Sequence, residues 1–222
     1  MRALARALLL GAMALACAGL AQAAQFGFTV APVAKYTGDI SVRTTDEPKT
    51  AEGKSAGLPY SVFLRSGPFH FAFLHYEQTA EKQYPVTVGA ANEFQSTANV
   101  QTDAFTFSYV YDFVSSRDLT VYSSLGLALL QSRWVSTTFD ATLIDFKDTR
   151  VEVSEKPALG GMLMIGSAWT LEQSTLVGVE LRYIGGKTKV TGTATRFGVL
   201  QSITDELDVS GVQLGLIVGV GF

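Results

Sequence analysis

The last segment of this sequence restricts its fold more than any other feature. In GVQLGLIVGVGF, from Gly211 to Phe222, large apolar residues occupy every second position, and the positions between them are mostly glycine. A period of two is that of a β-strand. Since the glycine-rich face carries few side chains, the apolar face is unusually bare, and it needs an apolar environment to cover it.

The other end of the chain indicates a compartment. MRALARALLLGAMALACAGLAQAA contains Arg2 and Arg6, then an apolar run to about Leu20, then Ala21-Gln22-Ala23 as a cleavage sequence. This arrangement is typical of a secretory signal peptide. We expect residues 1–23 to be removed, so that residues 24–222 form the mature protein as one domain.

Cysteine content and charge exclude several classes of site. Cys17 is the only cysteine and lies inside the signal peptide, so we expect no disulfide and no cysteine metal site in the mature chain. A lipoprotein would use Cys17, but the leucine usual three positions earlier is absent. Removing Arg2 and Arg6 takes the formal charge from −3 to −5, which gives no support to nucleic-acid binding.

Seven further segments alternate in the same way. Between Phe105 and Phe113, aromatic residues take every second position, which would be a solubility problem in water. No uncharged stretch of the mature chain reaches the length of a spanning helix. An exported chain with lipid-like faces and no such helix crosses a membrane as a closed barrel of strands. The seven segments are Gln25–Tyr36, Pro59–Ser66, Phe69–Glu77, Val100–Phe113, Leu119–Gln131, Ala158–Thr170 and Thr175–Gly186.

Connections between these segments alternate in length. Three are short turns, and four are long polar segments: Thr37–Leu58, Gln78–Asn99, Ser132–Lys156 and Gly185–Glu206. This pattern predicts an all-β fold, a transmembrane antiparallel up-and-down β-barrel of eight strands. An even strand number puts both termini on the periplasmic side and all four long segments at the cell surface.

At this level the sequence resembles the small outer-membrane barrel families of the OmpA transmembrane domain, OmpX and OmpW type. The likeness rests on the LGLIVGVGF ending, the ELRY segment at Glu180 and the FSYVYDF segment before a short turn. It implies the outer membrane of a Gram-negative bacterium, with lipid and lipopolysaccharide as surroundings. It also implies that Val218, Val220 and Phe222 form an assembly signal for the barrel-assembly machinery, with periplasmic chaperones as transient partners.

Strand parity assigns polar residues to the inside of the barrel. An eight-stranded barrel is just wide enough for side chains to fill, so buried charges there must pair with one another. The same residues, together with small inward residues such as Gly126 and Gly215, could instead line a narrow water-accessible path. The residues predicted for this polar lumen network are Arg65, His70, Asp112, Tyr122, Glu180, Arg182 and Gln213.

The chain offers two histidines, His70 and His75, to an enzymatic site. Some small barrels modify lipid A with a histidine and a serine near the rim. His75 falls on the outward parity near the rim, but Glu77 stands where the H-x-S spacing needs serine. No calcium, zinc, phosphate or nucleotide motif occurs, so we expect no catalytic residue, no metal and no cofactor.

These patterns favour a non-enzymatic barrel with a structural or surface-interaction role through its four extracellular loops. A narrow pore or small apolar-solute channel of OmpW type is the alternative, and a lipid A-modifying enzyme is the third possibility.

Overall fold

The computed structural model describes residues 24–37, 40–42, 54–85, 93–140, 157–171, 174–196 and 199–221. The predicted signal peptide, residues 1–23, and the terminal Phe222 lie outside the described residues.

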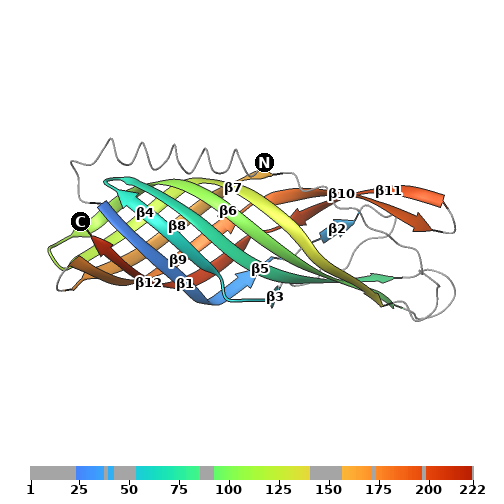
Figure 1. Ribbon diagram of the computed structural model, residues 1–222, viewed down its shortest axis with the longest axis horizontal. Helices are drawn as coiled ribbons and strands as arrows, with labels where there is room; N and C mark the ends of the chain where they lie inside the picture. The colour runs from blue at the N-terminus through green and yellow to red at the C-terminus, as the bar shows by residue number, and fades with distance from the viewer. Residues whose placement is uncertain are drawn as a thin grey trace.

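Eight antiparallel strands close into a barrel (Figure 1). Each pairs with its neighbour along the barrel wall, and β12 returns to β1 from Gly221 opposite Gln25 to Gly211 opposite Tyr36. The predicted eight-stranded up-and-down barrel is therefore confirmed. Its strands are β1 (Ala24–Tyr36), β4 (Tyr60–Ser66), β5 (Phe69–Pro85), β6 (Glu93–Ser115), β7 (Leu119–Asp140), β8 (Ala158–Thr170), β9 (Thr175–Gly185) and β12 (Gly211–Gly221).

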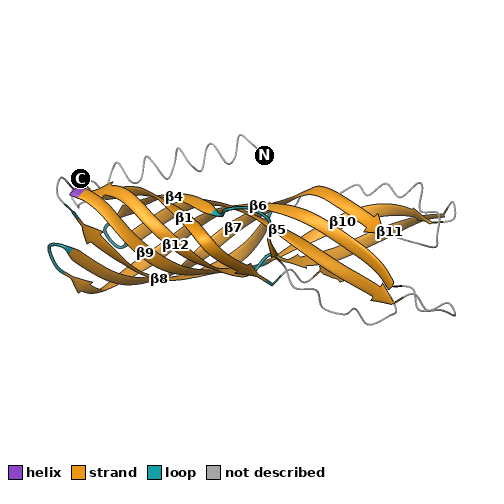
Figure 2. Cartoon of the chain, turned by 90° about the horizontal axis from the view of Figure 1, so that it is seen from below, coloured by secondary structure: helices purple, strands orange, loops and turns teal. Residues whose placement is uncertain are grey.

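The two ends of the barrel differ. At one end, called the terminal end here, lie Ala24, Gly221 and the three short turns that follow β4, β6 and β8. At the other, called the extended end, the longest strands run on past the rest of the wall (Figure 2). The turn between β4 and β5 is tight because Gly67 has a φ of 55°, a left-handed conformation that glycine adopts without steric cost.

The outside of the barrel is apolar and the inside is mixed. Burial alternates along the strands, as in β12, where each buried residue from Gly211 is followed by an exposed one. Large exposed apolar side chains occur on every barrel strand, among them Phe28, Phe107, Leu125 and Leu216. An apolar band of this kind is covered by lipid in transmembrane barrels. Among the described residues, no helix is long and apolar enough to cross a membrane.

Three strands are longer than the sequence predicts. β5 continues from Glu77 to Pro85, β6 begins at Glu93 instead of Val100, and β7 continues from Gln131 to Asp140. The alternation of apolar residues fades in these extensions, although the hydrogen-bonded register continues. Outside lipid neither face of a strand needs an apolar surface, so the signal that marks a membrane strand disappears before the strand ends.

The segment Gly185–Glu206, expected to be a loop, contains two strands. β10 (Lys187–Arg196) and β11 (Val199–Asp208) form a hairpin, and β2 (Ile40–Val42) pairs with β11 to make a separate three-stranded sheet. This sheet lies at the extended end of the barrel, at the same level along the long axis as the extensions of the long strands (Figure 1). A short strand β3 (Lys54–Ser55) pairs with β5 near the same end.

Candidate functional site

The seven residues predicted for the lumen lie in two places. Five of them are buried inside the barrel: His70, Tyr122, Glu180, Arg182 and Gln213. Arg65 and Asp112 lie at the mouth of the terminal end, with side chains 11% and 32% exposed.

At this mouth an ion pair joins β4 to β6. Arg65 Nη2 donates to Asp112 Oδ1 at 2.7 Å and Oδ2 at 2.6 Å, and Arg65 Nε donates to the Gly67 carbonyl at 3.3 Å. The Arg65 guanidinium also lies 5.5 Å from the centre of the Tyr122 ring, within the range of a cation–π interaction. The arginine therefore bridges β4, β6 and β7 at the terminal end.

A buried ion pair occupies the middle of the lumen. Arg182 Nη2 donates to Glu180 Oε1 and, at 3.1 Å, to Ser61 Oγ on β4. The side chains of Arg182 and Glu180 are 2% and 3% exposed. Buried charges require a partner of opposite charge. Arg182 and Glu180 are such partners for each other.

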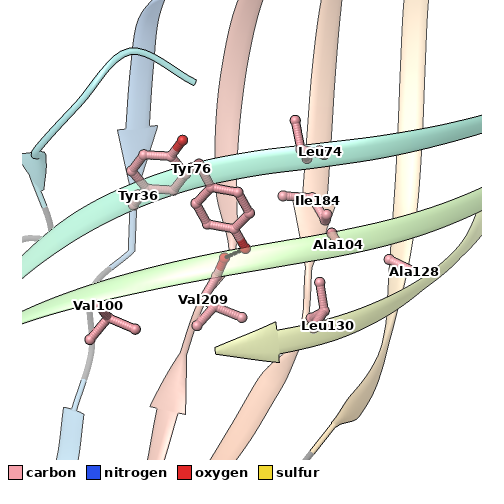
Figure 3. Packing of buried hydrophobic residues seen from close by; sticks show 9 residues of the cluster. All are labelled: Tyr36, Leu74, Tyr76, Val100, Ala104, Ala128, Leu130, Ile184 and Val209. Atoms are coloured by element: carbon pink, nitrogen blue, oxygen red, sulfur yellow. Dashed lines mark hydrogen bonds between the residues drawn. The ribbon is translucent and has the colours of Figure 1, made fainter. Parts of the chain in front are cut away.

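Nearer the extended end, apolar residues fill the lumen (Figure 3). Tyr36 and Tyr76 stack with ring centres 4.9 Å apart and planes inclined by 7°. Tyr76 donates to the Val209 carbonyl at 2.8 Å, and Tyr36 accepts from Gln213 Nε2 at 3.0 Å. These bonds hold both rings across the lumen. The whole cluster is Tyr36, Leu74, Tyr76, Val100, Ala104, Ala128, Leu130, Ile184 and Val209.

A second apolar cluster lies nearer the terminal end, below the buried ion pair. Phe63 belongs to it and stacks on His70 with ring centres 5.3 Å apart. The described lumen thus contains an ion pair at the terminal mouth, a buried ion pair and two apolar clusters. The members of this cluster are Phe63, Ala72, Val110, Tyr122, Met164, Ala168 and Ile217.

The small inward residues allow the strands of the wall to pack closely. A Cβ added at Gly126 would lie 2.2 Å from the Phe107 carbonyl oxygen, and one at Gly215 would lie 2.5 Å from Thr29 Cγ2. A Cβ added at any of four further glycines would also lie within 3 Å of a neighbouring atom: Gly160, Gly166, Gly178 and Gly219.

A narrow cleft lies along the inner side of β1 and β4, where Ala31 N–H still donates to the Pro59 carbonyl at 2.8 Å. The register of β1 against β12 shifts between Val30 and Val33, and β4 begins only at Tyr60. The cleft has an empty volume of about 160 Å³, in crevices too narrow for a water molecule. It extends from the buried Arg182 to Pro59 and Tyr60 at the start of β4.

Polar side chains face outward where the apolar band ends near the extended end. His75 Nδ1 lies 2.7 Å from Asp103 Oδ1 on the neighbouring strand, and His75 Nε2 lies 3.7 Å from Glu77 Oε1. Gln101 Nε2 donates to that glutamate, and the Tyr60 ring lies 5.1 Å from the imidazole. We call His75, Glu77, Gln101 and Asp103 the rim cluster.

Five residues that make contacts in these sites carry no recognisable signal in the sequence. Ser61, Tyr36 and Tyr76 contribute to the lumen, and Gln101 and Asp103 complete the rim cluster. Parity could have placed Ser61 and Tyr76 inside, but their partners lie on distant strands. Asp103 pairs with His75 through the register of β5 and β6, which no local pattern encodes.

No family model and no curated protein matches the sequence of the chain. Solved structures do match. The outer membrane protein OprG from Pseudomonas aeruginosa aligns over 89% of this chain and 94% of its own, with TM-score 0.53 and 10% identity. Neisserial surface protein A aligns over 90% of this chain and 97% of its own, with TM-score 0.46 and 14% identity.

At this level of identity the likeness to OprG establishes the fold alone. The fold is that of an eight-stranded β-barrel, and OprG, which shares it, is an outer membrane protein. The apolar exterior is what a barrel that crosses a lipid bilayer requires. In the part of the chain that the structure describes, no three histidine, cysteine or acidic side chains gather as metal ligands.

Proposed function

We propose that this protein is a non-enzymatic outer-membrane barrel with a structural or surface-interaction role, carried by the segments at the extended end. Both termini would then lie in the periplasm and the four long connections at the cell surface. The observation that carries the proposal is the filling of the lumen: two apolar clusters and two ion pairs occupy the inside of the described barrel. A barrel packed in this way acts through its surface.

Assembly partners follow from the same proposal. Lipid and lipopolysaccharide would surround the apolar band. Val218 and Val220 face outward on the last strand, 59% and 46% exposed, as an assembly signal requires. Recognition by the barrel-assembly machinery and periplasmic chaperones would also involve Phe222.

Planar-bilayer recording tests the filled lumen. We expect the refolded wild-type barrel to give a current trace without steps. The double variant Tyr36→Ala/Tyr76→Ala should give current steps, because it removes the two stacked rings from the lumen. A heat-modifiable shift on gels would show that both are folded. Discrete conductance steps from the wild-type protein would contradict the proposal.

The cleft along β1 and β4 supports the alternative, a channel for small apolar solutes, because its lining includes both buried residues of the lumen and Tyr60 on the outer surface. Uptake of a small apolar solute into vesicles containing the barrel would favour this role, provided that a bulky Ala31→Trp variant blocks it. A bilayer trace without current steps, together with no uptake of the solute, would contradict the channel role and support the structural role.

A further inference from the structure

The rim cluster contains an imidazole whose orientation is fixed. Asp103 contacts His75 Nδ1 at 2.7 Å, and the Tyr60 ring lies against the imidazole at 5.1 Å. A carboxylate on one ring nitrogen places the proton there and leaves the other nitrogen as a lone-pair donor. His75 Nε2 therefore carries the lone pair that can bind a metal ion, and it lies on the side of the ring that faces Glu77.

Glu77 is held in place from the neighbouring strand. Its Oε1 accepts a hydrogen bond from Gln101 Nε2 at 2.5 Å and lies 3.7 Å from His75 Nε2. That distance is too long for a hydrogen bond. It is close to the separation of about 3.4 Å that an imidazole nitrogen and a carboxylate oxygen have when both bind one tetrahedral zinc ion.

We propose that His75 Nε2 and Glu77 Oε1 bind a divalent transition-metal ion of the zinc class. Imidazole and carboxylate are ligands that suit such ions. Their side chains are 21% and 35% exposed, so an ion held between them is reached from outside and completes its coordination with water. This proposal is independent of the proposed surface role, because it needs only the register of β5 and β6.

In this site Asp103 is a positioning residue. It bonds the ring nitrogen that does not face Glu77, as the outer carboxylate does in carboxylate–histidine–zinc arrangements. Removing such a partner typically lowers metal affinity about 10- to 100-fold. Asp103 itself keeps a side chain 45% exposed.

Zinc titration of the mature, untagged protein in phosphate-free maltoside micelles tests the site. The chain has only two histidines, and His70 is buried in the lumen with 3% exposure, so the assay reports on His75. We expect one Zn²⁺ per chain by calorimetry, no saturable binding after His75→Gln, and at least a tenfold loss after Glu77→Gln. Asp103→Asn should weaken binding about 10- to 100-fold.

A matched control is Asp118→Asn, which removes an exposed carboxylate at the terminal end; we expect unchanged zinc affinity. Heat-modifiable migration checks that every variant is folded. Absence of saturable zinc binding, binding that survives His75→Gln, or an equal loss in Asp118→Asn would each overturn the proposal. The last outcome would show that zinc associates with acidic surface in general.

Discussion

At the scale of single residues, the buried charges in the lumen are tolerated because they occur as a pair. Arg182 and Glu180 lie two positions apart on β9, on the same face of the strand, and Ser61 takes a further hydrogen bond from the arginine. The pair at the mouth, Arg65 with Asp112, is partly exposed and is weakened by solvent screening. The two ion pairs therefore contribute differently to stability.

Replacing Arg182 alone should be strongly destabilising. Arg182→Met leaves the Glu180 carboxylate buried without its partner, and breaking a buried pair in this way costs about 3–5 kcal/mol. The double variant Arg182→Met/Glu180→Gln should recover most of that loss, because no unpaired charge remains. Urea unfolding of refolded protein in lipid vesicles measures both. A double variant no more stable than the single one would contradict this account.

Glycine substitutions distinguish the inner and outer faces of the wall. A Cβ at Gly126 would meet the Phe107 carbonyl at 2.2 Å, whereas nothing lies within 4 Å of one at Gly161. We therefore expect Gly126→Ala to lose about 1–3 kcal/mol through overpacking, and Gly161→Ala to remain near wild type. The fraction of heat-modifiable protein and its urea midpoint report the difference. Equal stability of the two variants would show that the wall near β6 and β7 relaxes freely.

At the scale of elements, the long strands have two parts that differ in their sequence pattern. Within the apolar band, alternation is strict because one face meets lipid and the other meets the lumen. Beyond it, the backbone pairing of β5, β6 and β7 continues while the alternation does not. The β10–β11 hairpin pairs with β2 and, among the described strands, with no strand of the barrel.

This separation predicts that the outer part of the hairpin is dispensable for folding. Replacing residues 189–206 with an Asn-Gly turn keeps the pairing of Thr188 with Leu207, and Asn-Gly suits a two-residue hairpin. We expect the shortened barrel to fold, with a free energy of unfolding within about 1 kcal/mol of the full chain, because loop length changes closure entropy slowly. Loss of heat-modifiable migration would contradict this.

At the scale of the whole molecule, the barrel reverses the usual distribution of side chains. Its exterior is apolar on every strand, and its interior holds the buried charges and hydrogen bonds. This is the arrangement expected when lipid is the outer solvent. The filled lumen leaves the extended end as the part of the described molecule best suited to contact other molecules, which is why we place the proposed function there.

The sequence by itself determined the strand count, the parity of each strand and the apolar band, since these depend on local alternation and on turn length. It also placed His70, Glu180, Arg182 and Gln213 inside, because parity is a local property. The polar extensions of β5, β6 and β7 and the β10–β11 hairpin could not be predicted, because in water their pairing needs no periodic apolar face.

Only the tertiary structure decided which residues meet. The stacking of Tyr36 on Tyr76, the bond from Arg182 to Ser61 and the pairing of His75 with Asp103 join strands that are separate in sequence. Such contacts depend on the register and closure of the barrel, which are set by all eight strands together. Local alternation fixes which way a side chain points, but closure fixes what it reaches.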